Sequence, residues 1–532
     1  MKALIAYYGL GVVAVFAAAA AALRCGAGRG AVRLRRVTSA VFIAALYIPL
    51  AQLGKYFSLH LYADFSHWLS LLHALSVYGL PVSFSHAFFA PGTANYFSVH
   101  FVPGIYLLGG AFFLVPSAVT LILLNTVLLF SAAIPLYKLA RVMLKDRILT
   151  RAVVALLLWY PTFQYTVLYE FEMLRFCIPV FLWMLYAWEA RKNLLYWVMV
   201  AAAVLVREEV GLTVFFFGLY ASIWSRRRLT GIATALAGLG GFLIITRLVM
   251  PAFRAGEYAH IAMGSFSGMG TSMADVAGYM VSHPAQTLVR MLGGVKLMNI
   301  AMFFVPLAGA PLFALSALVP FLPQAAIGLL SESTVHSSYM LYYLSPGIAF
   351  IIYASIKAFP RLVLSVRRWQ RGDASLKKTS YALAFSLLAA VITAGVFFGP
   401  SPLSLQFWFA RVRPAPFRTQ NFHYSAYAVT GHHLAVNRFV ERIPENAIVS
   451  TQQFLAPRLY RQKGVMLFPM LTSKDGAYTA DYILFDSTNN GLSSRSPAFI
   501  DESEFASIAA DTRQWKQVAT DGAYYLYERA GN

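Results

Sequence analysis

Long apolar segments alternate with short clusters of basic residues along the chain as far as residue 398. A helix needs about 20 mainly apolar residues to cross the hydrocarbon core of a bilayer, and most of these segments come close to that length. The pattern therefore predicts a polytopic α-helical membrane protein with about 12 transmembrane helices. The predicted spans are residues 3–23, 37–57, 118–139, 152–168, 176–188, 194–206, 210–224, 231–246, 295–307, 312–330, 339–356 and 381–398.

Residues 102–115 form another apolar segment, but one too short to cross a bilayer. If this segment crossed fully, the basic cluster that includes Lys138, Arg141 and Lys145 would lie outside. If it is inserted half-way, the same cluster lies in the cytoplasm, where the positive-inside rule places it. We therefore expect a half-inserted helix at this position.

Basic residues gather on the loops that this arrangement places in the cytoplasm. Five arginines, starting with Arg24, follow the first apolar segment, whereas only Lys2 precedes it. The positive-inside rule thus puts the N-terminus outside, and the later clusters put the C-terminus outside as well. The first segment also resembles a secretory signal, since a lysine precedes an apolar run that ends in alanines. We favour an uncleaved span.

The composition changes after residue 398, and short apolar stretches that are typical of strands replace the long segments. We divide the chain into an N-terminal helix with its basic loop (1–36), a transmembrane domain (37–398) with a first external loop (58–116), a linker (399–422) and a small extracytoplasmic α/β domain (423–532). The predicted strands of the last domain are 447–452, 465–470, 481–487 and 522–528, and its predicted helices are 426–443 and 502–510.

The composition supports a membrane protein and excludes two other classes. Of the 532 residues, 59% are hydrophobic and 12% are charged, and the mean hydropathy is +0.61. Soluble proteins have about 25% charged residues. The net charge of +21 does not indicate a nucleic-acid partner, because the basic residues are spread between apolar runs instead of lying on one soluble face. Cys25 and Cys177 fall on opposite sides of the membrane, so no disulfide is expected.

The stretch 60–100 is unlike a simple connecting loop. It alternates apolar and polar residues, as interfacial helices do, and its only carboxylate is Asp64. Asp64, His67, Leu71 and Ala74 recur at spacings of three and four, which places Asp64 and His67 on one face of a helix. We interpret the stretch as an outer lid that holds a reactive acid. A helix cap in an exposed loop is the alternative for Asp64.

Two further charged groups lie on the same side of the predicted bilayer. One comprises Glu170, Glu172 and Arg175, and the other is the triplet 207–209, Arg-Glu-Glu, which follows a segment too short to cross the bilayer. Ionisable residues at such depth are costly unless they pair or line an aqueous site. We therefore expect both groups to join Asp64 in one site.

Structural roles remain open for these residues. Glu170, Glu172 and Arg175 can form an ion pair that caps a span, and Arg207 can pair with Glu208 or Glu209 to fix helix packing. His100 can be an interfacial histidine. The trio His423, His432 and His433 lacks any recognisable zinc spacing.

Several motifs follow one another along the chain: YADFSHW, VHFVPGIYLLGGAFFLVPS, IPLYKLARVML, LYEFEMLRFCIPVFLWMLYAWEARK, AVLVREEVGLTVFFFGLY, ITRLVMPAF, LPQAAIGLLS, HSSYMLYYLSPGIAF, IPENAIVSTQQFLAPRLYR and ADYILFD. In this order they resemble a large family of predicted prokaryotic membrane proteins known only as domain of unknown function 2079. That family in turn resembles the C-type (GT-C) glycosyltransferases, which take a sugar from a polyprenyl-phosphate carrier and have an acidic residue on the first external loop. The resemblance thus implies a GT-C-like transmembrane domain over residues 37–398.

The resemblance implies a multi-pass glycosyltransferase of the bacterial cytoplasmic (inner) membrane, with a polyprenyl-phosphate sugar as donor. It implies that Asp64 is the general base, while cations or a divalent metal stabilise the leaving phosphate. One departure from the family pattern is that Ser66 and Ser70 stand where glycine and glutamine are usual. The residues expected to bind the substrate or carrier are His67, His100, Glu170, Glu172, Arg175, Arg207, Glu208, Glu209 and Arg254, with the arginines as phosphate partners.

Two other classes of function remain as alternatives. A transporter or flippase would also have about 12 spans, but it should show inverted repeats and interrupted helices that meet near the midplane. We find no such repeat, and the charges collect on one side. A non-catalytic scaffold would use the external α/β domain to bind a partner.

Overall fold

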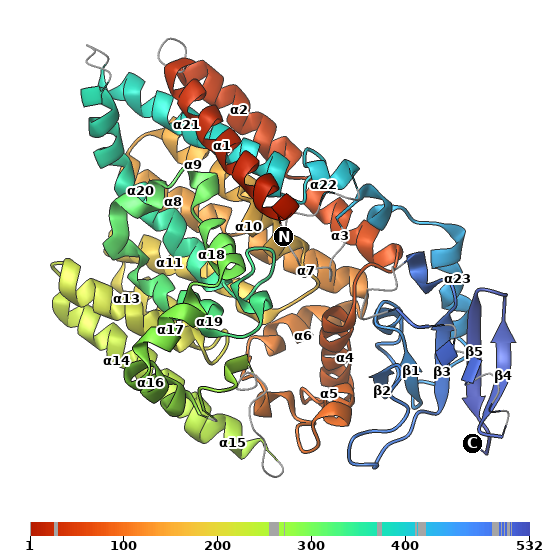
Figure 1. The fold of residues 1–532 in the computed structure, drawn as a ribbon. Helices are drawn as coiled ribbons and strands as arrows, with labels where there is room; N and C mark the ends of the chain where they lie inside the picture. The colour runs from red at the N-terminus through yellow and green to blue at the C-terminus, as the bar shows by residue number, and fades with distance from the viewer. Residues whose placement is uncertain are drawn as a thin grey trace.

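The helices of the protein form one body, and a small β-sheet lies at one edge of it (Figure 1). The structure is a computed structural model. It describes residues 2–25, 30–254, 265–270, 272–369, 375–409, 412, 422–491, 499–501, 503–504, 506–507, 511 and 513–531.

Seven helices among the described residues are long and apolar enough to cross a membrane, or eight if one bent helix pair counts as a single span. This agrees with a multi-pass membrane protein. The predicted number of about 12 is larger because it includes segments that fold as shorter helices. The seven are Ala6–Arg24, Ala31–Phe57, Ala118–Leu144, Arg228–Ala252, Ala310–Leu330, Ser345–Trp369 and Leu376–Phe398.

Several predicted spans begin or end a few residues away from the helices of the structure, and two depart further from them. The segment 152–168 is broken at Pro161, which has no amide hydrogen to donate to a preceding helix, so two helices replace one. The segment 339–356 begins its helix only at Ser345, and the residues before it run into the interior of the protein. Residues 102–115 form a ten-residue helix, which is compatible with half-insertion.

The helices have the following bounds: α1 Lys2–Cys25, α2 Gly30–Ala44, α3 Tyr47–Phe57, α4 Ala63–Tyr78, α5 Phe84–Phe89, α6 Ile105–Leu114, α7 Ala118–Phe130, α8 Ala133–Leu144, α9 Arg147–Trp159, α10 Pro161–Leu168, α11 Cys177–Glu189, α12 Asn193–Val204, α13 Val210–Trp224, α14 Arg228–Ile244, α15 Met250–Ala252, α16 Met273–Ser282, α17 Pro284–Met291, α18 Gly294–Ala301, α19 Leu322–Leu330, α20 Ser345–Trp369, α21 Leu376–Phe398, α22 Leu405–Trp408 and α23 Gly431–Val440.

The C-terminal sheet has five strands in the order β2-β1-β3-β5-β4. Strand β1 pairs in parallel with β2 and β3, and β5 pairs antiparallel with β3 and β4. Four strands fall where the apolar stretches predicted them. The fifth, β4, was not predicted because it is an exposed edge strand with a mainly polar sequence. The predicted helix 502–510 lies partly outside the described residues. The strand bounds are β1 Ile448–Thr451, β2 Gly464–Leu467, β3 Tyr482–Asp486, β4 Trp515–Thr520 and β5 Tyr524–Arg529.

Residues 58–116, which the sequence predicts as the first external loop, pack with the C-terminal sheet as one unit. Leu59 and Tyr62, which precede α4, lie in the same buried cluster as Phe439 of α23. At the edge of the sheet formed by β2, the amide of Val465 donates a hydrogen bond of 2.9 Å to Ser85 Oγ of α5. An edge strand left open is a template for unwanted pairing, and α5 covers this one. The sheet and the loop that carries Asp64 therefore lie on the same side of the helices (Figure 1).

Candidate functional site

A cavity of about 330 Å³ lies between the first external loop, including its helix α4, and segments near residues 172, 207 and 342. Five of the residues singled out in the sequence line it: Asp64, His67, His100, Glu172 and Arg207. These residues come from four separate stretches of the chain, so the fold brings together groups that the sequence only placed on one side of a bilayer. The other lining residues are Ala63, Ser66, Trp68, Ser85, His86, Phe89, Tyr96, Val99, Ser265, His336, Tyr342, Tyr343, Ala456, Val465 and Leu467.

Asp64 lies in the first turn of α4 but does not cap that helix. The carboxylate of Glu170 takes this role instead, because Glu170 Oε2 accepts a hydrogen bond of 3.1 Å from the amide of Phe65. Asp64 lines the cavity, and its Oδ2 accepts a hydrogen bond from the Tyr169 hydroxyl. Burial raises the pKa of Asp64 above the usual value for a carboxyl, although Tyr169 and the nearby arginines oppose this effect.

Arg207 is the centre of a buried ionic cluster. Its Nη1 lies 3.3 Å from Glu172 Oε1, and its Nε lies 3.1 Å from Glu209 Oε1. Its Nη2 lies 3.1 Å from His100 Nε2. Arg207 and Glu209 stand in the break between α12 and α13, at the position where the short apolar segments of the sequence predicted an interruption. The guanidinium thus joins three parts of the chain at the cavity wall.

The contacts of His100 fix its tautomer. Because Arg207 Nη2 can only donate, His100 Nε2 must accept, and the ring proton is on Nδ1. That nitrogen lies 2.6 Å from Glu208 Oε1, to which it donates. Glu208 Oε2 also accepts from the amide of Phe101, at 3.1 Å. Burial and the charge of Arg207 lower the pKa of His100 well below its usual value, so the ring is neutral at pH 7.

The carboxyls around Arg207 do not all carry a full charge at neutral pH. Burial raises the pKa of Glu172 to about 7, against the effect of Arg207. Burial raises the pKa of Glu209 as well. A second negative charge near Arg207 would disfavour the ionised form of Glu172. Glu172 can therefore take up a proton when an anion approaches Arg207.

Two of the expected phosphate partners lie outside this cavity. Arg175 is fully buried and donates to backbone carbonyls, those of Glu172 at 3.1 Å and Tyr169 at 3.3 Å among them. Its guanidinium therefore holds the loop that carries Tyr169 and Glu172, which favours a positioning role over a phosphate contact. Arg254 Nε donates to the Ser98 carbonyl at 3.2 Å, and so it supports the first external loop close to His100.

Aromatic residues of the cavity were not singled out from the sequence. Tyr342 stacks on Tyr343 with ring centroids 4.3 Å apart, and its ring lies 5.0 Å from that of Tyr169. Tyr342 and Tyr343 were read as part of a membrane span, but they precede α20. Pro346 could have indicated from the sequence that the helix begins after these tyrosines, since proline favours the first turn of a helix.

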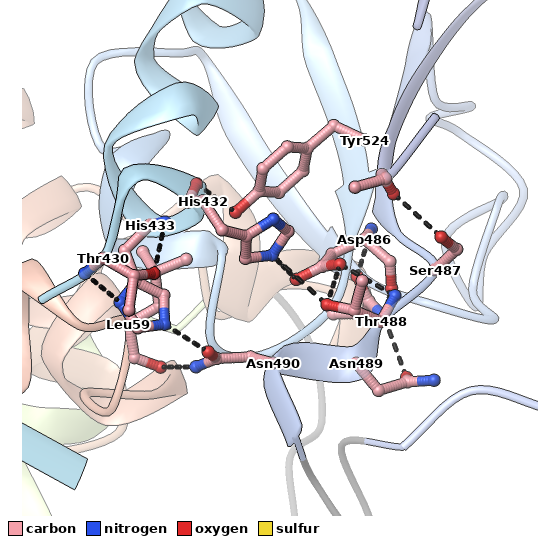
Figure 2. Close-up of polar contacts among 12 residues, drawn as sticks. Leu59, Thr430, His432, His433, Asp486, Ser487, Thr488, Asn489, Asn490 and Tyr524 are labelled. Carbon is pink, nitrogen blue, oxygen red and sulfur yellow. Dashed lines mark hydrogen bonds and ion pairs between the residues drawn. The ribbon is translucent and has the colours of Figure 1, made fainter. Parts of the chain in front are cut away.

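The C-terminal domain holds the segment that leads into α4 (Figure 2). Asn490 Nδ2 donates to the carbonyls of Ser58 and Leu59, both at 3.1 Å, while Asn490 Oδ1 lies 2.8 Å from His433 Nε2. Beside it, His432 Nε2 lies 2.9 Å from Asp486 Oδ2. Within the described part of the chain, no group of three or more His, Cys, Asp or Glu side chains could hold a metal ion. His433 holds Asn490 and so helps to anchor this domain to the loop of Asp64, whereas His432 contacts residues of its own domain.

The anchor gives a testable consequence. We expect Asn490→Ala to lower the midpoint of thermal unfolding and to speed protease cleavage of the first external loop. The buried Leu59 carbonyl loses its donor, at about 1–3 kcal/mol, while the Ser58 carbonyl keeps His60 Nδ1 at 2.8 Å. Differential scanning fluorimetry and limited proteolysis of the purified protein measure both effects. Lys516→Ala, on the exposed strand β4, is the matched control. An Asn490→Ala protein as stable and protease-resistant as this control would contradict the anchor.

The family model described as "Predicted membrane protein (DUF2079)" matches residues 54–522. Two solved structures of ArnT from Cupriavidus metallidurans are similar to this chain at 13% sequence identity. The one bound to undecaprenyl phosphate has a TM-score of 0.49 and covers 92% of this chain and 97% of its own. The one in the apo state has a TM-score of 0.44 and covers 92% and 98%. No curated protein matches the sequence.

Proposed function

The chain belongs to the family described as "Predicted membrane protein (DUF2079)", and from this premise we propose that it is a C-type membrane glycosyltransferase. Its donor is a sugar on a polyprenyl-phosphate carrier, and its acceptor is a glycan, lipid or protein hydroxyl outside the cytoplasmic membrane. The observation that carries the proposal is that a carboxylate with raised pKa, Asp64, and a guanidinium, Arg207, line one cavity. Sugar transfer needs such a base and such a cation together.

The reaction assigns a separate task to each group. Asp64 accepts the proton of the acceptor hydroxyl as the acceptor oxygen forms a bond to the anomeric carbon. The bond from that carbon to the phosphate oxygen breaks, and the carrier phosphate leaves with the electron pair. Arg207 stabilises the charge that develops on this phosphate. Glu172 lies against the same guanidinium and, with a pKa of about 7, can take up a proton as the negative charge grows.

The remaining lining fits a sugar. Tyr96, Tyr342 and Tyr343 line the cavity, where aromatic side chains can pack against the apolar side of a sugar ring. His67 lies beside Tyr96, with 4.7 Å between the ring centroids. Glu208, Glu209 and His100 keep Arg207 in place. Glu170 fixes the start of α4, so it positions Asp64 without touching the substrate.

The function is tested with the purified protein in proteoliposomes and a panel of polyprenyl-phosphate sugars. Release of the free carrier phosphate with transfer of the sugar to an acceptor supports the proposal. Movement of the intact lipid-linked sugar across the bilayer, with no cleavage of its glycosyl bond, would instead support a flippase.

The pH dependence of turnover gives a second test. Asp64 must be ionised to accept a proton, and its pKa is raised above the usual value of about 3.9. Activity is therefore present above the raised pKa and falls as the pH drops through it, at a higher pH than an exposed aspartate would give. Tyr169→Phe removes a donor that favours the ionised form, so this acidic limb moves up by about one pH unit. Tyr137→Phe, on α8, is the control, and an identical limb in both variants would contradict the role of Tyr169.

A further inference from the structure

The cavity lined by Asp64 and Arg207 has two further polar groups to which the proposed reaction gives no task. They are the imidazole of His86, on α5, and the hydroxyl of Tyr96. The two rings lie 6.2 Å apart between centroids. The ring of His67 lies 6.0 Å from that of His86 and 4.7 Å from that of Tyr96. The three rings thus form one cluster at the wall of the cavity.

The contacts of His86 fix its tautomer. Thr93 is completely buried, and its hydroxyl donates its one proton to the carbonyl of Ala90. Thr93 Oγ1 must therefore accept from His86 Nδ1, which lies at 2.8 Å. Burial lowers the pKa of His86 below its usual value, so the ring is neutral at pH 7. His86 Nε2 then has a lone pair and no proton.

This nitrogen is available to a ligand. His86 is partly exposed and lines the cavity, and its Nε2 lies on the side of the ring away from the contact with Thr93. Nε2 has no hydrogen-bond partner among the described residues, and it is not sealed from solvent. The unpaired Nε2 of His67, in contrast, is buried too completely for a ligand to reach it.

The hydroxyl of Tyr96 is a second group of this kind. Only 4% of Tyr96 is exposed, and the residue lines the cavity. Its hydroxyl makes no hydrogen bond within the described part of the chain, yet it is still open to solvent. Buried tyrosine hydroxyls usually have a partner. Burial also raises the pKa of Tyr96 well above its usual value, so the hydroxyl keeps its proton and can both donate and accept.

The hydrogen-bonding capacity of the two groups indicates the chemistry of the ligand. His86 Nε2 can only accept, so it does not suit the oxygens of a phosphodiester, which have no proton to donate. The neutral imidazole and the protonated hydroxyl carry no charge, so together they suit neutral polar groups. Hydroxyls on adjacent carbons are such groups, and a sugar ring carries several of them.

We propose that His86 and Tyr96 select the sugar by binding its hydroxyl groups. His86 Nε2 accepts from one hydroxyl, and the hydroxyl of Tyr96 bonds to another. The inference rests on the proposed function, because the sugar in question is the one on the polyprenyl-phosphate carrier. Arg207 then holds the phosphate of the carrier, while His86 and Tyr96 recognise the sugar attached to it.

The proposal is tested by equilibrium binding to the full-length protein in detergent, with no transfer reaction involved. The probes are undecaprenyl phosphate and its glucosyl, galactosyl and mannosyl derivatives, measured by microscale thermophoresis. We expect at least one sugar-bearing carrier to bind at least tenfold tighter than the free carrier. His86→Asn keeps a donor for Thr93 but lacks Nε2, and Tyr96→Phe lacks only the hydroxyl. Each should weaken the sugar-bearing carrier about three- to tenfold and leave the free carrier unchanged.

Matched variants show whether the loss is specific. His283→Asn and Tyr137→Phe change exposed residues that do not line the cavity, and they should bind every probe as the wild type does. Affinities of His86→Asn and Tyr96→Phe equal to those of these controls overturn the proposal. An equal loss for the free and the sugar-bearing carrier also overturns it, in favour of a phosphate contact or a disturbed cavity. So does a free carrier that binds as tightly as all three derivatives.

Failure of the proposed function would give a different result. In that case proteoliposomes show no sugar transfer, while the sugar-bearing carrier still binds through His86 and Tyr96. Transfer with unchanged binding in both variants would instead overturn only the role of these two residues.

Discussion

Asp64→Asn is expected to lower the rate of sugar transfer by about 100-fold or more, because general-base catalysis contributes about 10²–10⁴-fold and an amide cannot take a proton. The substitution keeps the shape of the side chain, and the amide oxygen can still accept from the Tyr169 hydroxyl. Folding should therefore be unchanged. The measurement is turnover of a polyprenyl-phosphate sugar by the purified variant, with thermal unfolding as the check on structure.

Glu504→Gln, an exposed acid of the C-terminal domain, is the control for loss of a carboxylate as such, and it should keep full turnover. Equal turnover by Asp64→Asn and this control would remove Asp64 from the reaction. Because Asp64 lines the cavity and Asn keeps its shape, we expect the Asp64→Asn protein to stay folded. An unfolded variant would contradict this placement of Asp64.

Arg207→Gln has the second largest expected effect. It removes the cation proposed to hold the carrier phosphate, and it leaves the buried Glu172 and the partly buried Glu209 without their partner. Breaking a buried ion pair in this way costs about 3–5 kcal/mol, so the variant should lose both turnover and stability. Thermal unfolding and turnover are measured together.

Two companion variants separate the two losses. Adding Glu172→Gln and Glu209→Gln to Arg207→Gln removes the unpaired charges, so stability should return while turnover stays lost. Arg207→Lys keeps the charge without the planar fork, and we expect a stable protein with a lower kcat. Recovery of turnover in the triple variant would show that Arg207 serves packing alone.

Local patterns in the sequence were enough to predict the elements that carry the site. The spacing of Asp64 and His67 predicted a helix there, and α4 begins at Ala63. The shortness of the apolar runs around residue 207 predicted a break, and α12 and α13 stop on either side of Arg207. Both predictions depend on neighbours in the chain, for which periodicity and length are sufficient.

Contacts between distant parts of the chain could not be predicted in this way. Glu170 caps α4 from 105 positions away, and its neighbour Tyr169 donates to the Asp64 carboxylate across the same separation. Tyr342 and Tyr343 line the cavity because α20 begins only after them, at Ser345. The helix start there depends on tertiary packing, whereas the apolar pattern alone favoured a longer span.

The role of the C-terminal domain also became visible only in three dimensions. The sequence predicted a separate external domain, but its buried cluster includes Leu59 and Tyr62 of the first external loop. Val465 and Leu467 of β2 even line the cavity of Asp64. The domain therefore forms part of the site, and substitutions in it should affect turnover.

The most direct measurement is an experimental structure of the protein with a polyprenyl-phosphate sugar in place. Our account predicts that the phosphate contacts Arg207 and that the anomeric carbon faces the space beside Asp64, where an acceptor oxygen can approach it to about 3–3.5 Å. A carrier phosphate bound away from Arg207, with the sugar outside the cavity lined by Asp64, would contradict the account.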